Sequence, residues 1–163
     1  METQGVVDPY SFAMDSALHA LAPRAKSRDE LLKHLIKRGV ELDTANAVLD
    51  HLELQGLLND LEFAKLWAQS RQRQKKLSKR VIAGELRTKG VAQDVIDEVI
   101  EEIDDQAEYQ LAFSLAEKKF RSCSHLESEK IYSRVVGVLN RKGFSSSLST
   151  RIVRELLGSH QAN

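Results

Sequence analysis

Three short motifs between residues 56 and 90 decide how this chain is expected to fold. They read Gly56-Leu-Leu-Asn-Asp60 followed by Phe63-Ala64, then Ser70-Arg-Gln-Arg-Gln-Lys-Lys-Leu-Ser-Lys-Arg80, and finally Leu86-Arg-Thr-Lys-Gly90. Asparagine and aspartate after a glycine are typical of a turn that caps a helix, and a glycine after a basic helix end is typical of helix termination. The stretch therefore predicts a turn, an amphipathic helix, a cluster of cations and a second helix.

The last of these motifs occurs three times along the chain. Leu86-Arg-Thr-Lys-Gly90-Val91 is matched upstream by Leu35-Ile-Lys-Arg-Gly39-Val40 and downstream by Leu139-Asn-Arg-Lys-Gly143-Phe144. The copies start at 35, 86 and 139, so they lie 51 and 53 residues apart. A recurrence of about fifty residues is typical of a modular array of helical units. We expect an all-α protein built from three tandem three-helix repeats, each similar to a helix-turn-helix.

The recurrence also gives the expected domain boundaries. The first helices of the repeats are expected at 9–22, 60–74 and 106–120. Asp8-Pro9 is a helix start, and Ser27-Arg-Asp-Glu30 forms a capping box in which Ser27 and Glu30 each satisfy a free backbone N–H. In the third copy Ile131 replaces the capping serine. The predicted organisation is a flexible arm at 1–8, repeats at 9–55, 56–104 and 105–157, and a flexible tail at 158–163.

Composition narrows the class of protein further. The 163 residues include two prolines and eight glycines, which favours helices, and apolar residues do not alternate as in a strand. A single cysteine, Cys123, excludes an internal disulfide and suits a reducing compartment. The sequence has no apolar run of membrane-spanning length and no signal peptide at its start. We expect a soluble, cytoplasmic monomer without a membrane partner.

Charge is strongly separated along the sequence. The chain has 24 basic and 24 acidic side chains, but from Lys65 to Lys89 there are nine Lys or Arg and a single acid, Glu85. Cations four residues apart, such as Arg71, Lys75 and Lys79, would repel one another on one helix face. Such a patch predicts an anionic partner, either DNA phosphate or an acidic protein groove. The candidate partner- and DNA-binding residues are Arg71, Arg73, Lys75, Lys76, Lys79, Arg80, Arg87 and Lys89.

The charge balance inverts in the next segment. Residues 91–117 contain nine acids and no Lys or Arg. One interpretation is the solvated face of a helix whose apolar residues, such as Val95 and Val99, are core. The alternative is that these acids pair with basic residues of a partner or with the basic run of this chain. Phe63 and Trp67, one helical turn apart, are interpreted as core rather than as base-stacking side chains.

Catalysis finds little support in the sequence. The five histidines are scattered, without metal-ligand spacing relative to one another or to Cys123. No glycine-rich phosphate loop and no nucleophile elbow is present. We expect a protein that is not an enzyme and needs no cofactor or metal.

Together these motifs resemble the RecX family, bacterial regulators of the RecA recombinase. The resemblance rests on Ser27-Arg-Asp-Glu-Leu31, the endings at 35–40 and 86–91, the turn at 56–64, and Ser70-Arg71 ahead of the basic run, and it covers roughly 15–157. It implies a crescent of tandem three-helix repeats that lies in the groove of a RecA filament on single-stranded DNA. It also implies inhibition of RecA, with the filament, and through it single-stranded DNA, as the partners.

A second hypothesis is a helix-turn-helix-like protein that binds double-stranded DNA directly, without a recombinase partner. The helices after Gly39 and Gly90 would then be the recognition helices. They carry acids instead of base-reading side chains, namely Asp43, Asp50, Glu53, Asp94, Asp97, Glu98, Glu101 and Glu102. Phosphate would repel such helices, so the first hypothesis is favoured. A purely structural scaffold would leave the cationic patch unexplained.

Overall fold

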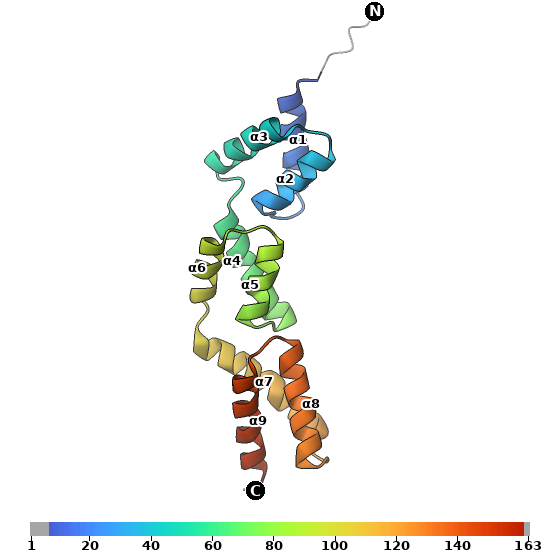
Figure 1. Cartoon of the computed structure of the whole chain (residues 1–163), viewed down its shortest axis with the longest axis vertical. Coiled ribbons are helices and arrows are strands. Elements are labelled where there is room, and N and C mark those ends of the chain that lie inside the picture. The colour runs from blue at the N-terminus through green and yellow to red at the C-terminus, as the bar shows by residue number, and fades with distance from the viewer. Residues whose placement is uncertain (1–6, 162–163) are drawn as a thin grey trace, which may run out of the picture. The chain divides into compact units, whose positions relative to one another are not determined.

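A computed structural model describes residues 7–161, and every regular element within them is helical (Figure 1). The all-α prediction is confirmed. Residues 1–6 of the expected arm and residues 162–163 of the expected tail lie outside the described residues, while the last helix continues past the expected end at 157. The elements are α1 (Pro9–Leu21), α2 (Arg28–Lys37), α3 (Leu42–Leu54), α4 (Asp60–Ser70), the π-helical turn η1 (Arg71–Lys75), α5 (Lys79–Thr88), α6 (Gln93–Glu101), α7 (Asp105–Cys123), α8 (Ser128–Arg141) and α9 (Ser146–Gln161).

Helices α1 and α2 begin at the capping residues that the sequence predicted. The Asp8 carboxylate accepts a hydrogen bond from the Ser11 backbone N–H, and Pro9 occupies the first turn of α1. Ser27 and Glu30 form the reciprocal capping box of α2. Each cap satisfies backbone donors that have no partner inside the helix, which is why these residues fix the first turn.

Three helices end in the same hydrogen-bonded geometry. The backbone N–H groups of Val40, Val91 and Phe144 donate to the carbonyls of Leu35, Leu86 and Leu139, each at 3.1 Å. The glycine before each donor is left-handed, with φ of 83° at Gly39, 74° at Gly90 and 89° at Gly143. This is the Schellman ending, in which a left-handed residue lets the chain turn back over its last helical carbonyls. The repeat read from the sequence is therefore confirmed at atomic detail.

Contacts divide the chain into two compact units, which we describe separately. The first contains residues 1–67 and 86–96, and the second contains 68–85 and 97–163. The division passes through the middle three helices, α4, α5 and α6. The expected repeat boundaries at 55 and 104 fall in the loops before α4 and α7. We propose that the three repeats are divided at these loops. The crescent implied by the family resemblance stays a prediction that small-angle scattering can test.

The core of the first unit lies between α1, α2 and α3, each of which packs on the other two. Leucines and valines at helical spacing fill it, with alanines where α1 approaches its neighbours closely. Tyr10, Met14 and Leu32 are partly buried at its margin. The core residues are Ala13, Ala17, Leu31, Leu35, Val40, Ala45, Val48, Leu49, Leu52 and Leu58.

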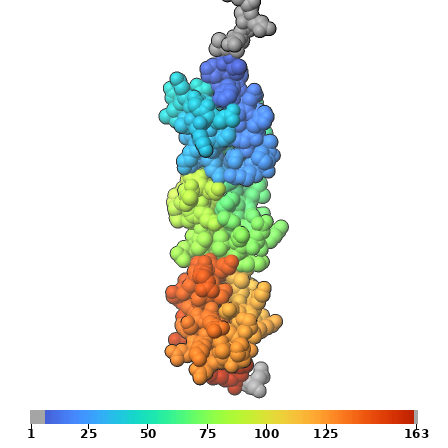
Figure 2. All heavy atoms as spheres, turned by 90° about the vertical axis from the view of Figure 1, so that its right-hand side faces the viewer, coloured from blue at the N-terminus to red at the C-terminus, as the bar shows by residue number. Residues whose placement is uncertain are grey.

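The second unit repeats this arrangement with α7, α8 and α9 (Figure 1). In Figure 2 the lighter orange surface of α7 lies directly beside the darker orange surface of α8. Helix α8 has 14 residues, whereas α2 and α5 each have 10, because it begins one turn earlier. Ile131 therefore lies inside α8 and is buried in the core, which explains why an apolar residue replaces the capping serine there.

Candidate functional site

The basic segment does not form a continuous helix. Helix α4 ends at Ser70, η1 follows, and Lys76 adopts a left-handed conformation with φ 56° before α5 begins at Lys79. The helical repulsion between Lys75 and Lys79 that the sequence suggested is therefore wrong, because the break at Lys76 places them on different elements. The segment is instead an exposed, wide helical turn that closes with backbone bonds from Lys76 and Leu77 to the Arg71 carbonyl.

This turn is fixed to the end of α8 within the second unit. Lys142 Nζ donates to the Lys75 carbonyl at 2.8 Å, and the Ser78 N–H donates to the Lys142 carbonyl at 3.0 Å. Arg80 Nε donates to the Gly143 carbonyl at 3.3 Å. The turn is thus held by the side chain and backbone of Lys142 and by the Gly143 carbonyl, and none of these bonds uses the side chains of Arg73, Lys75 or Lys76.

Three of the eight predicted binding residues are engaged in ion pairs. Arg71 makes a two-point pair with Glu85, with Nε–Oε2 at 2.8 Å and Nη2–Oε1 at 2.9 Å. Lys79 Nζ pairs with Asp105 at 2.5 Å. Lys89 Nζ lies 2.7 Å from a Glu30 carboxylate oxygen. These cations stabilise the fold and are less available to a partner.

Lys89 also lies over an aromatic ring of the first unit. Its Nζ is 4.7 Å from the centroid of Trp67, a cation–π contact, and the Trp67 ring stacks on Phe63 with centroids 6.0 Å apart. Phe63 is buried, which confirms its interpretation as core. Trp67 is half-buried, so it lies at the margin of the core, where its ring contacts a cation of the basic run, Lys89.

The other predicted residues are exposed. Arg87 Nε bonds the side-chain oxygen of Gln93 at 2.9 Å, and Arg80 makes the backbone contact described above. Arg73, Lys75 and Lys76 have no ion-pair partner among residues 7–161. In these last three, which we call the basic turn, neither an ion pair nor a side-chain hydrogen bond within the described residues engages the charged group.

A depression of about 340 Å³ lies beside the basic turn. Gln69, Gln72 and Arg73 supply amide and guanidinium groups on one side, and Ala107 and Leu111 of α7 supply an apolar floor. An amide can donate and accept hydrogen bonds, and a guanidinium donates up to five. The arrangement can hold a polar or anionic group of a larger molecule, with an apolar part resting on α7.

The acidic tract is used partly inside the protein. Glu108 accepts a hydrogen bond from the Lys79 backbone N–H at 2.8 Å, at the first residue of α5, and Asp105 pairs with the Lys79 side chain. On α6, Ile96 and Val99 are buried while Asp94, Glu98 and Glu101 are exposed. Both interpretations are thus confirmed in part: the α6 acids lie on a solvated face, and the α7 acids pair with the basic run.

In the second unit, the start of α5 contacts Glu108 and the Lys142-Gly143 ending of α8, and we call such a contact between successive repeats a joint. The first unit contains an equivalent joint. Asp60 accepts a hydrogen bond from the Arg28 backbone N–H at 2.7 Å, at the first residue of α2, as Glu108 does for α5. The Ser27 hydroxyl donates to the Lys89 carbonyl, next to the glycine that ends α5. At both joints the start of one repeat's second helix meets an acid and a Lys-Gly ending of the next repeat. The sequence contained these residues but gave no sign that they meet.

Electrostatics at this joint favour charged Glu30. Burial alone would raise the pKa of Glu30, but hydrogen bonds from Lys89, Arg24 and the Ser27 N–H outweigh it and lower the pKa to about 2. At Asp60, burial raises the pKa and prevails over the hydrogen bond from Arg28. The Glu30–Lys89 pair is therefore an ionic link between α2 and the end of α5.

These features define a class of protein: a tandem array of three-helix units with an ordered, exposed cationic turn. Within residues 7–161 no helix combines the length and hydrophobicity needed to cross a bilayer. Models of the RecX family match the chain three times, as the first three-helix domain at 13–52, the second at 59–100 and the third at 106–153.

Individual relatives agree with these matches. A regulatory protein RecX of Mycobacterium avium is 42% identical over 137 residues, which cover 83% of this chain and 79% of the relative. One of Streptomyces coelicolor is 36% identical over 150 residues, covering 92% and 80%. The crystal structure of RecX from Lactobacillus salivarius has the same fold, with a TM-score of 0.84 over 93% of this chain and 98% of that one at 22% identity. The chain belongs to the RecX family of regulatory proteins.

Proposed function

We propose that this protein binds in the groove of the RecA filament on single-stranded DNA and inhibits RecA activity. The inhibited steps are filament extension, ATP hydrolysis and strand exchange. The protein acts as a cytoplasmic monomer by binding alone, without catalysis, cofactor or metal. Family membership supports the regulatory role, and the basic turn supports an anionic partner.

The observation that carries this proposal is the exposure of the basic turn. Arg73, Lys75 and Lys76 have no acidic partner in the described part of the chain, whereas the nearby Arg71 and Lys79 each pair with an acid. Their backbone is already ordered by Lys142 and by the Ser78 N–H. A partner therefore gains the attraction of three charges without having to order the backbone that carries them. Arg80 and Arg87, which are also exposed, serve as secondary contacts.

Tandem repeats suit a filament as the partner. A filament presents the same surface at regular intervals, so several three-helix units can each make a weak contact. Once one unit is bound, the others act at high effective concentration, and the combined affinity exceeds that of any single contact. A protein bound in this way would obstruct both the addition of protomers and the entry of duplex DNA.

The proposal is tested with purified RecA, single-stranded DNA and ATP. Stoichiometric amounts of the protein should lower ATP hydrolysis and strand exchange. A protein that leaves both rates unchanged would contradict the proposed function.

The basic turn is tested by charge reversal. The triple variant Arg73→Glu, Lys75→Glu, Lys76→Glu should raise the concentration needed for half-inhibition by about tenfold or more, because three attractive contacts become repulsive. The matched control Lys118→Glu, Arg134→Glu, Arg154→Glu reverses three exposed cations of the second unit elsewhere. Equal losses in both variants would show that net charge alone matters and would remove the basic turn from the proposal.

A further inference from the structure

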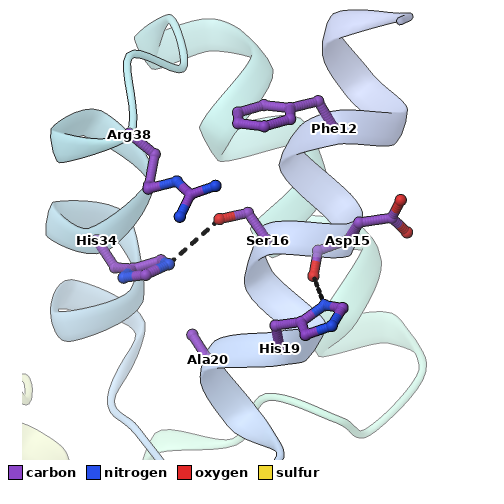
Figure 3. Close-up of a pocket in the computed structure, with 7 residues that line it drawn as sticks. All are labelled: Phe12, Asp15, Ser16, His19, Ala20, His34 and Arg38. Atoms are coloured by element: carbon purple, nitrogen blue, oxygen red, sulfur yellow. Dashed lines mark hydrogen bonds between the residues drawn. The ribbon is translucent and has the colours of Figure 1, made fainter.

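A second surface of interest is a pocket of about 410 Å³ between α1 and α2 (Figure 3). All its lining residues belong to the first unit, whereas the basic turn belongs to the second. Two histidines that are 15 positions apart in the sequence, at 19 and 34, line the same cavity. The side chains that matter are Phe12, Asp15, Ser16, His19, His34 and Arg38.

The polar groups of this pocket favour an anion. Ser16 Oγ lies 3.2 Å from His34 Nε2, and Ser16 is only 8% exposed, so its hydroxyl is held at the base of the cavity. The Arg38 guanidinium extends into the same gap, while the Asp15 carboxylate points away from it (Figure 3). His19 Nδ1 donates to the Asp15 carbonyl at 2.9 Å, because a carbonyl can only accept. The groups that face the cavity are thus mostly donors.

Flat surfaces line the outer part of the pocket. The Arg38 guanidinium carbon lies 5.5 Å from the centroid of the Phe12 ring, and Phe12 is 37% exposed. The imidazole of His19 lies on the same helix two turns further along. Aromatic rings and guanidinium planes are the groups on which proteins stack unpaired nucleobases.

The size of the pocket separates two kinds of anionic ligand. A lone carboxylate of an acidic side chain would leave most of the cavity unfilled, whereas about 300–1,000 Å³ is the usual range for small organic ligands. An acidic side chain would also leave the exposed part of Phe12 uncovered. A nucleotide satisfies both features, with a phosphate for the donors and a base for the flat surfaces.

We propose that this pocket binds one nucleotide of a single-stranded nucleic acid. The base stacks on the Phe12–Arg38 pair, and the phosphate accepts hydrogen bonds from the Ser16 hydroxyl and from the edge of the guanidinium, while the Ser16 oxygen accepts from His34 Nε2. The inference rests on the proposed function for the setting in which a single strand is met. It adds a direct contact with nucleic acid, made by the first three-helix repeat.

The test measures binding of the full-length protein to a fluorescein-labelled oligothymidine single strand by anisotropy, without recombinase. Phe12→Ala should weaken binding by about fivefold to 150-fold, since one stacked base contributes about 1–3 kcal/mol. The control Leu18→Ala truncates an apolar residue of α1 that is 40% exposed and does not line the pocket. It should leave the affinity unchanged.

A second pair of variants separates the pocket from general electrostatics. Arg38→Ala and Lys37→Ala each remove one positive charge from the end of α2, but only Arg38 lines the pocket. At the same salt concentration, the dissociation constant of Arg38→Ala for the oligonucleotide should be at least about five times that of Lys37→Ala. Circular dichroism and thermal melts of all four variants identify any that have lost the fold.

Several outcomes would overturn the inference. They are no binding of the oligonucleotide by the wild-type protein, equal effects within either pair of variants, or equally effective displacement by polyglutamate of matched charge. The last would identify the pocket as a site for an acidic protein segment. These failures are distinguishable from failure of the proposed function, which is measured as RecA inhibition by the wild-type protein and needs no variant of the pocket.

Discussion

Glu30 links the two helices on either side of the first joint. Its carboxylate accepts hydrogen bonds from Lys89 Nζ at 2.7 Å, from the Ser27 N–H at 3.2 Å and from the Arg24 guanidinium at 3.3 and 3.4 Å. Every donor except the Ser27 N–H is a cation, so the charged form of Glu30 is strongly favoured. The pKa of about 2 expresses this preference, and it makes the stability of the first unit depend on pH.

We predict that Glu30→Gln destabilises the protein by about 2 kcal/mol at pH 7, since hydrogen bonds to a charged group contribute about 1.5–3 kcal/mol each. The folded pKa of Glu30 lies below its ordinary value of 4.5, so the stabilisation is complete above pH 5 and is lost as the pH falls toward 2. The difference between wild type and variant in urea unfolding should therefore shrink over this range. The control Glu98→Gln changes an exposed glutamate. A difference that stays constant from pH 7 to pH 2 would contradict the prediction.

Lys89 illustrates what one residue's sequence context cannot reveal. It ends a cationic motif, and we predicted it to bind a partner. Its carboxylate partner, Glu30, is 59 positions away, and its aromatic partner, Trp67, belongs to another helix. No periodicity or spacing connects these residues, so only the folded chain identifies Lys89 as a structural cation.

At the scale of the element, helix ends were predictable because their signals are local. Asp8, Ser27 and the glycines at 39, 90 and 143 act on backbone groups within about five residues. The π-helical turn was not predictable. We expected a helix to 74, and residues 71–77 contain no glycine or proline that would mark the left-handed turn at Lys76.

The glycines that end the helices differ in how closely other atoms approach them. The same substitution by alanine should therefore have different costs at different endings. Gly39 and Gly143 are both left-handed, but a Cβ on Gly39 would meet nothing within 4 Å. A Cβ on Gly143 would lie 2.2 Å from Val81 Cγ2 and 2.6 Å from Ser78 Oγ. Gly39→Ala should therefore cost about 1–2 kcal/mol for backbone strain alone, and Gly143→Ala clearly more, because it also separates α5 from the end of α8.

Chemical unfolding of Gly39→Ala and Gly143→Ala, together with a third variant, Gly90→Ala, checks this difference. Gly90→Ala should resemble Gly143→Ala, since its Cβ would lie 2.3 Å from the Asp29 Cβ. If all three substitutions cost the same, the close approach at the joints would contribute nothing and the prediction would fail.

At the scale of the whole molecule, the net charge is zero, but basic and acidic residues are concentrated in different segments of the chain. A polyanion can therefore bind the basic segment. The basic turn is uncompensated, while exposed acids gather on α6. Exposed charges are screened over about 8–10 Å at physiological salt. Acids that lie farther than this from the basic turn therefore have little effect on what binds there.

We expect RecA inhibition to depend on salt through this turn. Raising potassium chloride from about 50 to 200 mM should weaken inhibition by the wild-type protein, because bound phosphates release counterions as cations replace them. The triple glutamate variant of the basic turn should respond less steeply, since it has lost those contacts. Measured half-inhibition concentrations at four salt concentrations give both slopes, and parallel slopes would argue against contact between the turn and an anionic surface.

By itself, the sequence determined that the protein is helical, that three similar units follow one another, and where most helices begin and end. These properties depend on residue spacing and on caps, which act over a few positions of one segment. Only the tertiary structure decided which cations are available to a partner, because their acids lie 14, 26 and 59 positions away in the chain. Ion pairs form where folding brings opposite charges within about 4 Å, and no local pattern encodes that distance.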